Sequence, residues 1–189
     1  GVALLNRGLP GNNVVDGTLL LSLMRSATIS SYPFAGGYEP GESSNLGLEL
    51  GVQRTFNYAL VPHTGDWRAA HIYRAGLEFN NPLIVRVLPS HSGSLPKRWG
   101  LLRVSPGNVV MSAFKPSRGG GVVLRVYEAS GQRTEGAKIT LPPDTVVVNE
   151  CNLLEESVRK LGFTRNTLTF DLAPYQIKTF HIFRGGASR

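Results

Sequence analysis

The sequence contains one cysteine, Cys151, among its 189 residues. A single thiol cannot form an internal disulfide, so we expect a protein of a reducing compartment, the cytoplasm. Cys151 lies in the run Val-Val-Val-Asn-Glu-Cys-Asn-Leu-Leu, where a small buried residue is expected. A reactive thiol would need an exposed, electropositive surrounding. We therefore expect a structural cysteine and not a catalytic one.

Long apolar runs and clusters of basic residues are lacking as well. No run approaches the roughly 20 apolar residues that span a bilayer, so we expect no membrane partner. The net charge is +7, but the densest basic group is only Lys97, Arg98 and Arg103. Nucleic-acid-binding proteins gather such residues in a stripe. A solvated basic surface, or an acidic neighbouring domain, explains the charge better, and we expect no nucleic-acid partner.

What the sequence does have is glycine, proline and many short apolar runs. With 41% hydrophobic and 17% charged residues, its composition is globular. Periodicity predicts one helix over 66–78, with Asp66 at the N-cap, and a long loop over 30–51. A helical turn or two is expected in 153–161. The predicted strands cover 2–6, 18–25, 53–60, 83–88, 101–104, 109–114, 122–128, 137–141, 145–149, 167–172 and 176–183. This spacing indicates an all-β sandwich with one short helix.

The ends of the sequence predict how the chain is organised. Because it opens on the apolar, strand-like run Gly-Val-Ala-Leu-Leu-Asn, we expect it to be part of a longer protein. Residues 1–184 are predicted to form one β-sandwich domain, and 185–189 a flexible tail. The sequence leaves the oligomeric state open.

No group of side chains predicts a catalytic centre. Glycoside hydrolysis usually needs two carboxyl groups that face the scissile bond, and no acidic residue stands in such a context. The acidic residues considered are Asp16, Glu39, Glu42, Glu49, Asp66, Glu78, Glu128, Asp144, Glu150, Glu155, Glu156 and Asp171. The pair 155–156 is expected to be an exposed acidic step. His63, Asp66 and His71 match no zinc motif, so we assign no metal site to this chain.

Blocks of sequence along nearly the whole chain resemble those of a known family when taken in order. They are Gly1-Val-Ala-Leu-Leu-Asn-Arg-Gly-Leu-Pro10, Asp16-Gly-Thr-Leu-Leu-Leu-Ser-Leu-Met-Arg-Ser26, Phe56-Asn-Tyr-Ala-Leu-Val-Pro-His-Thr-Gly-Asp-Trp67, Asn80-Asn-Pro-Leu83, Leu124-Arg-Val-Tyr-Glu-Ala-Ser-Gly131, Asn152-Leu-Leu-Glu155 and Leu172-Ala-Pro-Tyr-Gln-Ile-Lys-Thr-Phe180. The set resembles the C-terminal region of glycoside hydrolase family 38. The turn Asn6-Arg-Gly-Leu-Pro lacks the aspartate that commonly follows this asparagine in the family. In this it resembles bacterial members, including those that act on mannosyl-glycerate-type substrates.

The resemblance implies a retaining α-mannosidase that acts on mannose-containing carbohydrate. In that family an upstream α/β barrel holds a zinc ion, an aspartate nucleophile and an acid-base aspartate. No block here corresponds to those residues, so neither a catalytic residue nor a cofactor is assigned to this chain. The implied partner is the upstream catalytic domain of the same chain. The implied fold is a β-sandwich with super-sandwich-like extra strands, compatible with a galactose-mutarotase-like architecture, that buttresses the barrel.

The resemblance also suggests residues that reach the rim of the sugar site. Arg25 matches an arginine-bearing block of the family, and its planar fork suits sugar hydroxyls or a carboxylate of the barrel. The alternative for Arg25 is an interdomain salt bridge. His63 and Asp66, beside Trp67, are the second candidates for the rim. Their alternative roles are a loop lock for His63, a helix cap for Asp66 and a core position for Trp67.

A stand-alone carbohydrate-binding module is the other function that we consider. Such a module usually displays exposed aromatic side chains on a platform. Both tryptophans, Trp67 and Trp99, lie in segments where core or turn roles are available, which favours the accessory-domain interpretation. Arg125 alternates with Tyr127 in a predicted strand, and packing against its neighbours is the role expected for it.

Overall fold

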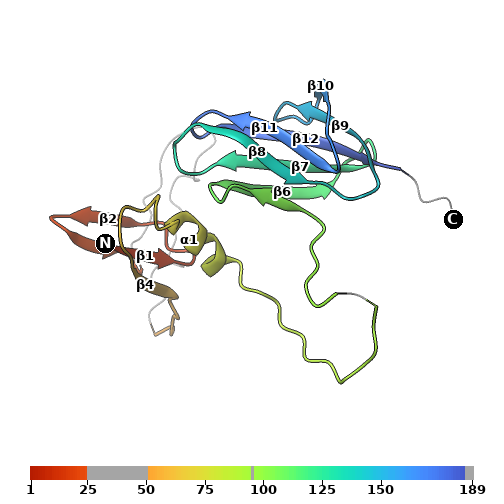
Figure 1. Ribbon diagram of the computed structural model, residues 1–189. Helices are drawn as coiled ribbons and strands as arrows, with labels where there is room; N and C mark the ends of the chain where they lie inside the picture. The colour runs from red at the N-terminus through yellow and green to blue at the C-terminus, as the bar shows by residue number, and fades with distance from the viewer. Residues whose placement is uncertain (25–50, 95, 186–189) are drawn as a thin grey trace, which may run out of the picture. The chain divides into compact units, whose positions relative to one another are not determined.

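The computed structural model describes residues 1–24, 51–94 and 96–185. These residues form twelve strands and one helix, which confirms the expected all-β class with one short helix (Figure 1). The chain divides into two compact units, Gly1–Ile84 (unit 1) and Val85–Arg189 (unit 2). The single domain over 1–184 stays a prediction. The expected loop at 30–51 falls almost wholly outside the described residues, as does the tail beyond residue 185.

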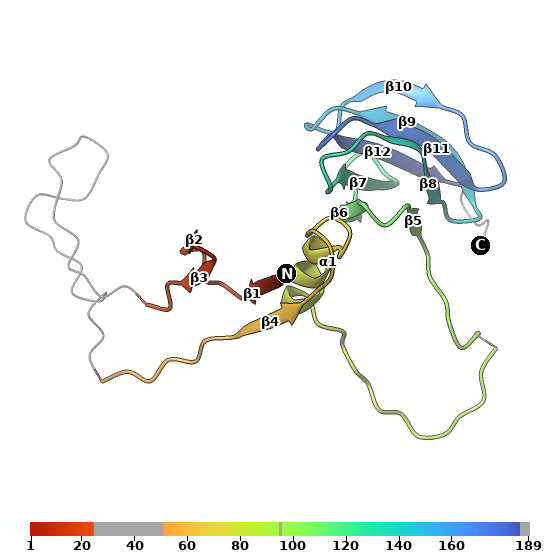
Figure 2. The ribbon, with the colours of Figure 1, turned by 60° about the vertical axis from the view of Figure 1, so that its left-hand side comes forward.

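In unit 1 a two-stranded antiparallel sheet carries the helix. Strand β1 (Val2–Asn6) pairs with β4 (Tyr58–Pro62), and helix α1 (Ile72–Asn80) lies against β1 (Figure 2). The side-chain amide of Asn80 donates to the Asn6 carbonyl at 3.0 Å, which ties the end of the helix to the end of the strand. The strand predicted over 2–6 is confirmed.

Strands β2 (Asn12–Val15) and β3 (Thr18–Leu21) form a hairpin in unit 1. The two-residue connection places Asp16 at φ 47° and Gly17 at φ 75°. Positive φ at both central residues defines a type I′ turn, which matches the twist of the flanking strands and favours Asp-Gly. Strand β2 is not among the strands that the sequence predicted. The strand expected at 18–25 ends at Leu21.

Helix α1 begins at Ile72 and not at Asp66 as expected. Residues 66–70 form a separate turn, in which the Ala70 N–H donates to the Asp66 carbonyl at 3.1 Å. His71 then adopts a left-handed conformation with φ 50°, which interrupts the helical path before α1 starts. The helical spacing of residues 66–78 is therefore present in the sequence, but the left-handed conformation of His71 separates the 66–70 turn from helix α1.

Unit 2 is a sandwich of two antiparallel sheets. One sheet has the order β10 (Ser157–Leu161), β9 (Thr145–Cys151), β12 (Ile177–Arg184), β7 (Val122–Glu128), β6 (Val109–Pro116). The other has the order β11 (Thr167–Leu172), β8 (Thr134–Thr140), β5 (Arg103–Ser105). The helical turn expected in 153–161 is wrong, because residues 157–161 pair with β9. The strand expected at 83–88 is also wrong, since that run has no regular structure in the described chain.

The core of unit 2 lies between its two sheets. Alternation directs Leu124 and Val126 of β7 inward, both with 0% exposure. Phe170 of β11 and Phe180 of β12 meet across the sandwich with ring centroids 4.9 Å apart. Burying each such side chain contributes about 1.5–3 kcal/mol. The core consists of Val109, Leu124, Val126, Ala137, Ile139, Leu141, Val148, Leu168, Phe170, Leu172, Phe180 and Ile182.

Candidate functional site

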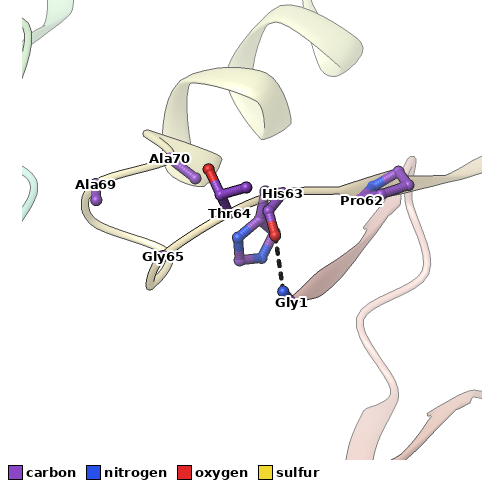
Figure 3. A pocket seen from close by; sticks show the side chains of 7 residues that line it. All are labelled: Gly1, Pro62, His63, Thr64, Gly65, Ala69 and Ala70. Carbon is purple, nitrogen blue, oxygen red and sulfur yellow. Dashed lines mark hydrogen bonds between the residues drawn. The ribbon is translucent and has the colours of Figure 1, made fainter.

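Of the three residues predicted for the substrate rim, Arg25 lies outside the described residues. His63 follows β4 and lines an open hollow of about 660 Å³ in unit 1 (Figure 3). Its ring lies beside Gly1, whose amino group donates to the His63 carbonyl oxygen at 2.7 Å. The lining residues are Gly1, Pro62, His63, Thr64, Gly65, Ala69 and Ala70.

Asp66 does not line this hollow, although it is only three residues from His63. Its Oδ1 accepts the backbone N–H groups of Ala69 at 2.8 Å and Arg68 at 3.1 Å. These bonds, with the Arg68 guanidinium 3.6 Å away, lower the pKa of the Asp66 carboxyl. The geometry is that of a capping residue for the 66–70 turn. The structure thus brings His63 to the hollow and gives Asp66 its capping role.

The Nδ1 atom of His63 is buried, and no hydrogen-bond partner for it occurs among the described residues. Buried polar atoms in native proteins nearly always have a partner. A hydrogen-bonding group is therefore expected to complete the surroundings of this ring.

Aromatic side chains gather next to the 66–70 turn. Trp67 is 38% exposed, so the core position considered for it is wrong. The Arg68 guanidinium carbon lies 4.3 Å from the centroid of the Trp67 ring. The Tyr73 ring meets the Trp67 ring edge-on, with 6.3 Å between the two centroids. His71 Nδ1 lies 2.7 Å from the Tyr73 hydroxyl. Unit 1 therefore presents an aromatic side chain to solvent on a supported turn.

Unit 2 has a second hollow, of about 590 Å³, on the face of the five-stranded sheet that points away from the core. One row of paired residues crosses this face: Lys115 of β6 lies opposite Val123 of β7, and Val123 lies opposite His181 of β12. His181 is only 7% exposed. Its Nε2 lies 2.6 Å from the Gly120 carbonyl, which accepts the ring hydrogen. The hollow is lined by Lys115, Pro116, Ser117, Arg118, Gly119, Leu154, Glu155 and His181.

The loop between β9 and β10 folds back over this face. Its Glu155 reaches Lys115 at 2.7 Å and Arg125 at 3.5 Å, and the neighbouring cations lower the pKa of the Glu155 carboxyl. Arg125 also donates to Thr179 Oγ1 at 3.0 Å and to the Leu153 carbonyl at 3.1 Å. Glu155 is therefore held in an ion-pair network, and the exposed acidic step expected at 155–156 is wrong for this residue.

Sequence reasoning missed this polar site. The sequence feature that could have indicated it is the alternation of side chains along two strands. Arg125 and His181 occupy the positions between the apolar residues that face the core. Alternation places such residues on the second face of a sheet, which is commonly solvated. It does not reveal that a distant loop covers that face.

Among the described residues, Glu128 is the carboxylate whose pKa is shifted most, and its role is structural. It is 0% exposed at the end of β7. Burial by itself raises the pKa of this carboxyl, but hydrogen bonds from Ser130, Asn108 and the Tyr175 backbone outweigh burial and lower the pKa to about 2. Ser130 and Asn108 donate to Oε1, whereas the Tyr175 and Gly131 N–H groups donate to Oε2 at 3.1 and 2.7 Å. Both oxygens of Glu128 are therefore occupied in holding loops.

Within the described ranges, no three His, Cys, Asp or Glu side chains come together as a metal site would require. The same part of the chain contains no helix with the length and apolar character of a membrane span. Cys151 is 7% exposed in β9, as expected for a structural thiol.

These features define unit 2 as an antiparallel β-sandwich domain with a polar site on one outer face. Residues 108–180, which lie within it, match the glycosyl hydrolases family 38 C-terminal beta sandwich domain. This match and the relatives below agree with the resemblance to family 38 that the ordered blocks predicted.

Relatives extend the similarity across both units. Human "Alpha-mannosidase 2C1" is 30% identical over 184 residues, which cover 94% of this chain and 16% of that protein. The mouse protein of the same name is 29% identical over 186 residues. A bacterial "Putative mannosylglycerate hydrolase" from Halalkalibacterium halodurans is 27% identical over 182 residues, 95% of this chain and 19% of that protein. The chain spans less than a fifth of these curated relatives, which include mammalian and bacterial proteins.

Proposed function

We propose that this chain is the non-catalytic C-terminal part of a longer retaining α-mannosidase, where it buttresses the catalytic domain. The main support is the coverage: nearly the whole chain aligns with about a sixth of human alpha-mannosidase 2C1. In this proposal the longer protein hydrolyses α-mannosidic bonds, and His63 and Arg25 lie near the rim of its sugar site. The single buried thiol of Cys151 fits a cytoplasmic location.

Exposed apolar surface supports the buttressing role. The run 83–88 leaves Leu83 at 93%, Ile84 at 89% and Val87 at 92% exposure. The β2–β3 hairpin adds Val14 at 63% and Leu20 at 48%. Exposed apolar side chains that gather in one place mark interfaces in soluble proteins. We assign each of the two segments, the run 83–88 and the β2–β3 hairpin, to contact with the remainder of the longer protein, because the relatives have most of their length outside the matched region.

The zinc ion implied by the family does not fit this chain's described residues, since they bring together no set of three possible ligands. The proposal therefore places zinc and both catalytic carboxylates in the rest of the longer protein. No step of the reaction is assigned to residues of the two units.

The direct test compares the 189-residue chain with a longer protein that contains it. The chain alone should not turn over an aryl α-mannoside, whereas the longer protein should. Turnover by the purified chain that is lost on the substitution His63→Ala would contradict the non-catalytic role. In the longer protein, Val87→Asp should lower both thermal stability and activity. The matched control is Val158→Asp, which changes a valine that is 67% exposed on strand β10.

A carbohydrate-binding module is the second candidate function, and the exposure of both tryptophans favours it. Trp67 is 38% exposed and Trp99 is 69% exposed. Aromatic rings of this kind can stack on a sugar face. Titration of the 189-residue chain with mannose and mannobiose, followed by tryptophan fluorescence, separates the two functions. Saturation at low millimolar sugar or below, abolished by Trp67→Ala or Trp99→Ala, would favour the module.

A further inference from the structure

We propose that the hollow on the outer face of unit 2 binds a small molecule through an anionic group, a phosphate or a carboxylate. The proposed function does not use this hollow. It lies between the β6–β7 turn, residues 117–121, and the loop 152–156, with His181 at its floor.

The charge of the site favours an anion. Lys115 and Arg118 line the hollow with Glu155, and Arg125 lies behind Glu155 at 3.5 Å. The two cations and one carboxylate that line the hollow leave an excess of one positive charge (2 − 1 = 1), to which Arg125 behind Glu155 adds. Glu155 is already held by Lys115 at 2.7 Å, so its charge is matched within the site. The planar fork of an arginine such as Arg118 suits phosphate and carboxylate oxygens.

The site is also preformed. Its floor is built from paired strands, with Val123 flanked by Lys115 on one side and His181 on the other. The Gly120 carbonyl fixes the His181 ring through Nε2 at 2.6 Å. Sites on rigid strands lose little entropy when a ligand binds. The strand residues of the hollow, Lys115, Pro116 and His181, are therefore held in place before an anion binds.

Size and lining distinguish the ligand class. The volume of about 590 Å³ lies in the range of small-molecule sites and exceeds the needs of a bare phosphate ion. No Trp, Tyr or Phe side chain lines the hollow, so a flat aromatic platform for a neutral sugar is lacking in this part of the described chain. The lining therefore favours a small molecule that carries a negative charge over a neutral carbohydrate.

The test is titration of the ¹⁵N-labelled 189-residue chain with inorganic phosphate, acetate and neutral mannose at constant ionic strength. Phosphate or acetate should cause saturable shifts of the amide signals of Arg118, Gly119 and Gly120. Saturation by phosphate alone indicates a phosphorylated ligand, saturation by acetate alone indicates a carboxylate ligand, and saturation by both indicates a site that accepts either anionic group. Shifts that stay linear with both anions, or saturation by mannose alone, would overturn the proposal.

Two matched variants identify the site. Arg118→Gln removes a cation from the rim of the hollow, and it should weaken anion binding at least fivefold. Arg103→Gln removes the same charge from β5, an exposed position on the other sheet, and should leave binding within twofold. Equal weakening by both variants would show that net charge alone attracts the anion, which would contradict the site. Circular dichroism of both variants checks that the fold is retained.

Discussion

The two units of this chain bury their apolar side chains to very different extents. Unit 2 encloses a core of twelve buried residues between two sheets. Within the described part of unit 1, Leu5 and Leu9 are the buried hydrophobic side chains, while both strands of the β2–β3 hairpin expose theirs. Unit 2 thus has the core of an independent domain. In the proposed function, the exposed apolar side chains of unit 1 contact another part of a longer protein.

The largest expected effect tests the core of unit 2. Phe180→Ala removes a ring with 0% exposure and should lower the free energy of unfolding by about 3–5 kcal/mol, because a cavity replaces it. Urea denaturation followed by circular dichroism measures the change. Phe114→Ala, at a ring that is 39% exposed on β6, should cost less than about 1.5 kcal/mol. Equal losses for the two variants would contradict the assignment of the core.

The next effect concerns the buried carboxylate of Glu128, also in unit 2. Because its pKa falls from 4.5 to about 2 on folding, it stabilises the protein fully above pH 4.5. That stabilisation, roughly 3 kcal/mol, is lost as the pH falls from 4.5 towards 2. Glu128→Gln should therefore destabilise the chain by about 2–3 kcal/mol at pH 7, and the difference from wild type should shrink towards pH 2.

Denaturation curves at pH 7, 4 and 2.5 would test this pH dependence. Glu135→Gln is the control, since the Glu135 side chain is 74% exposed on β8. A difference between Glu128→Gln and wild type that stays constant with pH would show that the carboxylate charge does not matter.

A smaller effect is expected in unit 1, at the turn before α1. Asp66→Ala removes the oxygen that accepts the Ala69 and Arg68 amides and should destabilise the 66–70 turn. Hydrogen exchange of the Ala69 amide should become faster. Asp66→Asn retains an accepting oxygen and should preserve most of the protection. If Asp66→Ala leaves exchange unchanged, the capping role assigned to Asp66 is wrong.

The smallest effect sharpens the contrast between buried and exposed apolar residues. In the 189-residue chain, Val87→Asp should change the free energy of unfolding by no more than about 0.5 kcal/mol, because the side chain is 92% exposed. Val148→Asp places the same charge at a position with 0% exposure and should prevent folding of unit 2. A large loss for Val87→Asp would show that run 83–88 packs within this chain.

Much of unit 2 could be predicted from local pattern. The strands predicted at 122–128 and 167–172 agree with β7 and β11, since alternating apolar residues bounded by turn residues specify a half-buried strand. The helical turn predicted in residues 153–161 was wrong, because a short run with Leu and Glu fits a helical turn as well as an edge strand. Pairing with β9, a contact outside the run itself, decided in favour of the strand.

The candidate sites were harder to predict than the strands. His63 and Asp66 were chosen together because they are close in sequence, yet the backbone turn directs one to a hollow and the other to amide groups. The outer-face site joins Lys115, Glu155 and His181, which come from separate strands and a loop. Such a set arises from long-range pairing, and a pattern read along one segment does not contain it.

Strand β12 occupies the middle of the five-stranded sheet, although it comes last in chain order among the described strands. Strands β7 and β9, which flank it, have no other common neighbour in that sheet. During synthesis, which proceeds from the N-terminus, β6, β7, β9 and β10 must therefore leave the ribosome before the strand that joins them exists. Until residues 177–184 emerge, two open strand edges remain available to other chains. The five-stranded sheet therefore cannot close until residues 177–184 have been synthesised.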